Sequence, residues 1–152
     1  MVSFRDDPAL LRVVRDAIYG TIASTAAAPT TADVARAHGI DEQDVAAAYR
    51  TLADSHVIVL KPGTHEVWSA PPFSAVPTAF RVQAGDKAWY APCAWDAFGI
   101  PAALKRSTTC AARCAWSGDP LSCGVNDGAS FGDGLIHLLV PAAHFWDDIV
   151  HT

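Results

Sequence analysis

The stretch Trp89-Tyr90-Ala91-Pro92-Cys93-Ala94-Trp95-Asp96-Ala97-Phe98-Gly99-Ile100-Pro101 carries the most informative pattern in this 152-residue sequence. An aromatic run leads into Pro92, a residue type that favours the first turn of a helix. The pattern predicts a short helix from Pro92 to Phe98, which Gly99 and Pro101 stop or kink. Cys93 is then expected in the first helical turn, with Asp96 three residues on and on the same face.

Cys93 and Asp96 make an unusual pair of acidic side chains. Free N–H groups and the helix dipole at a helix start favour a thiolate, so the position predicts a lowered pKa for Cys93 and the most reactive thiol of the chain. The carboxylate acts the other way, because like charges raise each other's pKa. The pairing suits a cation held between the two groups, or a carboxyl that keeps a proton for delivery. The same spacing also arises by chance, since an aspartate in a first turn is ordinary helix capping.

The surrounding sequence predicts a small mixed β-sheet with short helices packed on it. A strand is expected at 79–82, before a turn at Gly85-Asp86, and later strands at 108–116, 121–125 and 134–140. Residues 117–120 and a glycine-rich loop at 126–132 separate the later strands, and a helix is expected at 141–150.

The first part of the chain predicts a different unit. Asp7-Pro8 starts one helix, the capping-box-like run from Thr30 starts a second, and Asp41 starts a third. A strand at 56–60 and a return strand at 66–68 follow. This order is that of a winged-helix-like unit, placed at residues 1–70, with the sheet domain at 71–152. A proline-rich connector at 69–78 is expected to pack on the surface as a stiff segment, and the whole is α+β.

Charge argues against nucleic acid as a partner. The chain has a net charge of −5, and residues 1–60 contain five arginines, no lysine and eight acidic residues. The third helix would lead into a DNA groove with Asp41, Glu42, Gln43 and Asp44, which repel phosphate. No apolar run reaches the roughly 18–20 residues that span a membrane, and the first residues do not resemble a secretion signal. A cytoplasmic location without membrane or nucleic-acid partners is therefore expected.

All four cysteines, Cys93, Cys110, Cys114 and Cys123, lie in the second half of the chain. In a cytosolic protein such clustering suggests metal or thiol chemistry more than disulfides, although free cysteine also often fills core. A zinc site made by Cys110, Cys114 and Cys123 lacks the usual two-residue spacing and an obvious fourth ligand.

Residues 72–82 and 89–101 together resemble the organomercurial (alkylmercury) lyase family. Residues 114–121 look like the family's second cysteine segment, and residues 136–149 resemble the approach to its last active-site strand. The resemblance implies that Cys93 is the first mercury-binding cysteine, that Asp96 gives the proton, and that Cys114 is structural. It implies protonolysis of a carbon–mercury bond, in which two thiolates bind the soft metal and an acid protonates carbon. The substrate is then a small organomercurial, mercury(II) is the product ion, and no cofactor is required.

The resemblance ends before the family's second essential cysteine. That residue is expected in the strand after residue 149, where the sequence closes with His151-Thr152. We therefore expect mercury(II) binding through Cys93 but poor or no cleavage of organomercurials, unless another cysteine, His144 or His151 replaces the missing thiol. The alternatives are a non-catalytic homologue that binds a soft metal or another thiol-reactive ligand, and a winged-helix sensor of such a ligand, which the acidic first unit disfavours.

Two further expectations concern aromatic residues and assembly. Trp95, between Cys93 and Asp96, is expected to wall the site, whereas Trp116 and Trp146 are expected in the core. An open edge of the predicted sheet would invite pairing with a second copy, so a homodimer is a possible assembly.

Overall fold

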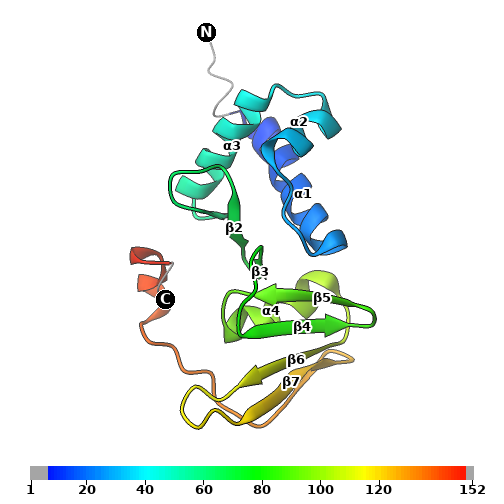
Figure 1. Ribbon diagram of the computed structural model, residues 1–152, viewed down its shortest axis with the longest axis vertical. Coiled ribbons are helices and arrows are strands. Elements are labelled where there is room, and N and C mark those ends of the chain that lie inside the picture. The colour runs from blue at the N-terminus through cyan, green and yellow to red at the C-terminus, as the bar shows by residue number, and fades with distance from the viewer. Residues whose placement is uncertain (1–6, 150–152) are drawn as a thin grey trace.

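The computed structural model describes residues 7–149 and is shown in Figure 1. Its described residues form three helices followed by an eight-stranded sheet. The α+β class is confirmed. In chain order the elements are α1 (Pro8–Thr25), α2 (Thr31–His38), α3 (Glu42–Asp54), β1 (Val59–Leu60), β2 (Val67–Ala70), β3 (Phe73–Ser74), β4 (Phe80–Ala84), β5 (Lys87–Ala91), α4 (Ala94–Leu104), β6 (Thr108–Arg113), β7 (Pro120–Asn126), β8 (Ala129–Phe131) and the 3₁₀-helix η2 (Ala142–Asp147).

Local capping signals place the first three helices as predicted. The Asp7 carboxylate accepts a hydrogen bond from the Ala9 N–H (2.9 Å), and Pro8 is the first residue of α1. Thr30 and Asp33 form a reciprocal capping box at the start of α2, and the Asp41 carboxylate caps α3. Each contact satisfies a backbone N–H that the helix itself leaves free. The hairpin β1–β2 follows α3, so the expected element order is present, while the winged-helix assignment and the lack of DNA affinity remain predictions.

The sheet differs from the expected mixed type, because every pair of described strands is antiparallel. Its order is β1-β2-β3-β5-β4-β6-β7-β8. Short turns such as Gly85-Asp86 join several neighbouring strands, and only antiparallel neighbours can be joined so briefly. Strands β5 and β6 each run antiparallel to β4, which lies between them, and α4 makes the longer connection from one to the other.

Four other local predictions are wrong. Helix α4 continues through Gly99 and Pro101 to Leu104, because Ile100 and Pro101 are buried and tertiary packing outweighs the helix-breaking residue types. Residues 134–140 form no strand, and Leu135 and Leu139 are exposed, since none of the described strands pairs with this segment. Strand β8 instead lies in the predicted glycine-rich loop, where it pairs with β7. The expected helix at 141–150 is the shorter 3₁₀-helix η2.

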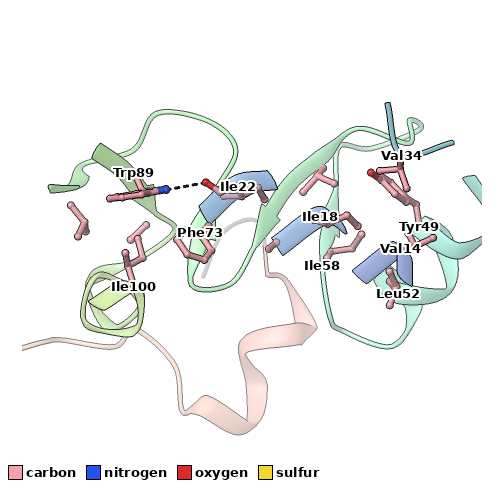
Figure 2. Packing of buried hydrophobic residues seen from close by; sticks show 14 of the residues in the cluster. Val14, Ile18, Ile22, Val34, Tyr49, Leu52, Ile58, Phe73, Trp89 and Ile100 are labelled. Carbon is pink, nitrogen blue, oxygen red and sulfur yellow. Dashed lines mark hydrogen bonds between the residues drawn. The ribbon is translucent and has the colours of Figure 1, made fainter. Parts of the chain in front are cut away.

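One hydrophobic cluster joins the helices to the sheet. Ile18 and Ile22 of α1 pack in the same cluster as Phe73, Trp89 and Ile100 (Figure 2). The Trp89 indole N–H also donates a hydrogen bond to the Ile22 carbonyl (2.9 Å). The proline-rich connector is packed as predicted, because Phe73 within it is 2% exposed and pairs with Ala70 of β2. The predicted boundary between two domains at residues 70 and 71 remains a prediction. The hydrophobic cluster and the sheet both contain residues from each side of it.

Within residues 7–149, no helix is both long and apolar enough to cross a bilayer. The segment after β8 runs back toward the helical end of the molecule (Figure 1). There the Trp146 ring stacks on His56, with centroids 4.3 Å apart. The prediction that Trp116 and Trp146 are core residues is wrong: Trp116 is 96% exposed and Trp146 is half-buried at the surface. Trp116 lies in the turn after β6, which no described element covers.

Candidate active site at Cys93 and Asp96

Cys93 lies at the junction between the end of β5 and the start of α4. It is the N-cap residue of α4, with an extended backbone (φ −144°, ψ 176°), and Asp96 lies in the first helical turn. The short helical rise brings the two side chains together, and the Cys93 thiol donates a hydrogen bond to Oδ2 of Asp96 at 3.3 Å. The spacing of three residues therefore produces a thiol–carboxylate pair, although Cys93 caps the helix and does not belong to its first turn.

Burial dominates the acidity of this pair. Both side chains are half-buried, and loss of solvent raises the pKa of the Cys93 thiol. The negative charge of Asp96 raises that pKa further, while the backbone amides of Asp96 and Trp95 act in the opposite direction. The predicted lowering of the Cys93 pKa is therefore wrong, because desolvation outweighs the helix start. Burial also raises the pKa of Asp96, and the hydrogen bond from Cys93 partly offsets this.

Helix α4 is fixed by close packing against the connector. A Cβ atom added to Gly99 would lie 2.8 Å from the Cβ of Pro72, so the absence of a side chain at Gly99 permits this approach. Gly99 lies one turn beyond Asp96 on the same helix. The position of the Cys93–Asp96 pair therefore depends on the connector as well as on the strand before it.

Tyr19 links the connector to α1 and was not identified from the sequence. Its hydroxyl donates to the carbonyls of Val57 (2.9 Å) and Pro71 (3.3 Å). Burial raises the pKa of Tyr19, the nearby Arg15 charge lowers it, and the Asp96 carboxylate raises it, so α1 lies within electrostatic range of the site. The sequence contains no signal for this neighbour, since Tyr19 and Asp96 are far apart in the chain.

Trp95 does not occupy the expected place. Its side chain is 64% exposed, so it lies mainly in solvent although it separates Cys93 from Asp96 in the sequence. Successive side chains of a helix point about 100° apart, so the side chain of Trp95 points away from that of Asp96. One surface hollow lies over β4, β6 and β7 and another between α1 and α2, and neither is lined by Cys93, Trp95 or Asp96. The expectation that Trp95 walls the site is therefore not supported by its mainly exposed side chain.

The other proposed ligands lie elsewhere. Cys110 and Cys123 face each other across β6 and β7, while Cys114 follows β6 and its sulfur accepts from the Ser117 N–H (3.5 Å). In the described part of the chain, no three Cys, His, Asp or Glu side chains converge as a metal site, so Cys110, Cys114 and Cys123 are not brought together. His144 pairs with Asp147 (2.9 Å), and His151 lies outside the described residues.

The order of thiol reactivity is a direct test of these electrostatics. Hydrogen bonding from Ser117 lowers the pKa of Cys114, so at neutral pH we expect iodoacetamide to modify Cys114 faster than Cys93. Asp96→Asn removes the charge that raises the Cys93 pKa, so its modification rate should increase several-fold, with Cys114 unchanged as internal control. Peptide mass spectrometry over time gives both rates. A Cys93 rate that falls or stays constant in Asp96→Asn would contradict this account of the pair.

The comparisons with known proteins identify the family. The family model described as MerB, alkylmercury lyase, matches residues 73–151, which include Cys93 and Asp96. The chain belongs to the alkylmercury lyase family. A solved structure described as "Crystal structure of the mercury-bound form of MerB2" superimposes with a TM-score of 0.65 at 22% identity, over 82% of this chain and 59% of that one. That likeness shows a shared fold, and the chain spans 59% of the length of that structure's chain. Among curated proteins, none matches the chain significantly.

Proposed function

We propose that this chain acts as an organomercurial lyase-like protein, in which Cys93 binds mercury and Asp96 protonates the carbon attached to it. The observation that carries the proposal is the hydrogen bond from the Cys93 thiol to Asp96 Oδ2 (3.3 Å), which lies inside the region matched by the alkylmercury lyase family. A soft metal prefers sulfur, and a carboxyl group at this distance can donate a proton to an atom bound to that metal.

In the proposed reaction, one proton is transferred in two steps, first from Cys93 to Asp96 and then from Asp96 to carbon. An organomercury cation forms a mercury–sulfur bond with Cys93, and the displaced thiol proton passes along the existing hydrogen bond to Asp96. The protonated Asp96 then gives that proton to the carbon, the carbon–mercury bond breaks, and the hydrocarbon leaves. Mercury(II) remains on the Cys93 sulfur beside the regenerated carboxylate. Every proton and electron pair is accounted for without a redox partner.

The half-buried environment supports this order of events. Because burial raises the pKa of Asp96, its carboxyl holds a proton more readily than an exposed aspartate does. The raised pKa of Cys93 keeps the thiol protonated until a metal displaces that proton, so the proton needed for carbon is already in the site. The packing of Gly99 against Pro72 keeps α4, and with it Asp96, in a defined position.

A second sulfur ligand is the missing part of this proposal. Among residues 7–149, no third Cys, His, Asp or Glu joins Cys93 and Asp96. A single thiolate holds mercury but supplies less electron density to the carbon–mercury bond than two do. We therefore propose that these 152 residues bind organomercurials and cleave them slowly, and that capture without cleavage is the second candidate function.

Capture of phenylmercury tests the assignment of Cys93. In a Cys114→Ser chain, which lacks the thiol whose pKa is lowered, we expect one phenylmercury adduct, located on Cys93 by peptide mass spectrometry. The additional substitution Cys93→Ser should remove that adduct, while circular dichroism verifies that the fold is intact. An adduct on Cys110 or Cys123 in the Cys114→Ser chain would show that Cys93 is not the mercury-binding residue.

A further inference from the structure

A second pair of thiols lies in the sheet, separate from Cys93. Cys110 of β6 is directly opposite Cys123 of β7, so both side chains project from the same face. Cys110 is 1% exposed and Cys123 is half-buried. The Cys110 thiol donates a hydrogen bond to the Ala111 carbonyl (3.9 Å), and burial, followed by the neighbouring Cys123, raises the pKa of Cys110 to about 11. Cys110 and Cys123 are therefore neighbouring thiols at the hydrophobic core, and burial favours the protonated form of Cys110.

This pair is structurally independent of the candidate active site. Cys93 follows β5, and β4 lies between β5 and β6 in the sheet. On β4, Val82 is the partner of Cys110 on one side and of Trp89 on the other. Trp89, Val82, Cys110 and Cys123 thus form a row across four neighbouring strands, and most of this row is buried in the core. Neither Cys93 nor Asp96 belongs to that row.

We propose that Cys110 and Cys123 form a two-coordinate site for a soft, thiol-seeking metal cation, of which mercury(II) is the representative. Both thiols lose their protons to solvent, two metal–sulfur bonds form, and no electrons are transferred. Two sulfurs without a further ligand satisfy a cation that accepts linear coordination, whereas zinc takes four ligands. The described residues bring no third Cys, His, Asp or Glu to this pair.

Strand geometry favours a bridging ion over a disulfide. Directly opposite residues in an antiparallel pair have Cβ atoms about 4.5–5.5 Å apart. A disulfide requires about 3.5–4.5 Å, so closing one would draw β6 and β7 together. An ion placed between the sulfurs adds the length of two metal–sulfur bonds and fits the wider spacing without that movement.

The approach to the pair is narrow. A Cβ atom added to Gly132 would lie 2.6 Å from the Cβ of Cys123, so the backbone at residue 132 lies directly against this cysteine. Cys110 is nearly inaccessible behind it. A small inorganic mercury ion can therefore reach the two sulfurs more easily than phenylmercury, the ligand used to test Cys93.

The test uses a Cys93→Ser/Cys114→Ser chain, in which Cys110 and Cys123 are the remaining thiols. With mercuric chloride as the probe, native mass spectrometry should show one mercury per chain with the loss of two protons. X-ray absorption should show two sulfur neighbours. Because Cys93 is absent, the result is independent of the proposed lyase chemistry. Two mercury ions per chain, or a single protein sulfur on each ion, would overturn the proposal.

Single removals measure the contribution of the pair. Cys123→Ser and, separately, Cys110→Val in the same background should retain mercury at least about 10²-fold less well against a competing monothiol, because the second sulfur then binds from solution and not within the chain. Circular dichroism verifies folding, and Cys123→Ser keeps the test valid if the buried Cys110→Val chain is unstable. Retention unchanged by Cys123→Ser, or equally tight zinc binding, would overturn the two-sulfur assignment.

Discussion

Replacing Asp96 by asparagine is expected to slow the release of hydrocarbon from bound phenylmercury by about 10²–10⁴-fold, the usual contribution of a positioned general acid. The amide preserves the size of the side chain but cannot hold the proton that the Cys93 thiol gives up. The measurement is single-turnover release of benzene, with a small thiol present so that mercury can acquire a second sulfur. The expected loss lies in the rate of release, whereas the amount of phenylmercury bound should be maintained.

Two controls make this outcome specific. In a Cys114→Ser background, Cys93→Ser should abolish both binding and release, whereas Cys114→Ser alone should leave the release rate unchanged, because Cys114 lies in the turn after β6. Equal release rates for the unsubstituted chain and Asp96→Asn would remove Asp96 from the proposed mechanism. Rapid multiple turnover by the unsubstituted 152-residue chain would contradict the expectation of slow cleavage, and would mean that another group or the added thiol serves as an effective second ligand.

Gly124→Ala is expected to reduce the free energy of unfolding by about 3 kcal/mol or more, at the upper end of what overpacking costs. A Cβ atom at this position would lie 2.1 Å from the carbonyl oxygen of Thr108 and 3.1 Å from Cε1 of Phe131. The first contact is with backbone, so no side-chain rotation can relieve it. The strands β6 and β7 would have to separate next to the Cys110–Cys123 pair. Urea unfolding followed by circular dichroism measures the change.

Gly20→Ala is the matched control for this substitution. Gly20 is exposed inside α1, and an added Cβ there meets no atom within 4 Å. Alanine has the higher helix propensity, so this variant should be more stable by roughly 1 kcal/mol. A Gly124→Ala chain as stable as the unsubstituted one would mean that the close approach of β6 and β7 at Gly124 is not a constraint on the fold.

Much of the helical part of the fold was predictable from the sequence, because capping acts within one turn. Asp7, Thr30 and Asp41 accept N–H groups two or three residues away, so their identity and spacing were sufficient to locate three helix starts. The contact between Cys93 and Asp96 was predictable for the same reason, since a separation of three residues is a local distance on any helix. Membership in the alkylmercury lyase family was also recognisable from residues around this pair.

Tertiary structure decided the properties that depend on distant parts of the chain. The pKa of Cys93 is raised because the folded chain removes solvent from the thiol, an effect that no pattern in residues 92–96 encodes. Helix α4 passes through Pro101 because its buried face packs on the sheet, and Tyr19 approaches Asp96 only once α1 and α4 are both folded. The sequence by itself therefore determined which chemical groups lie within a turn of one another. The packing of distant segments determined their solvation, and solvation sets which group holds the proton.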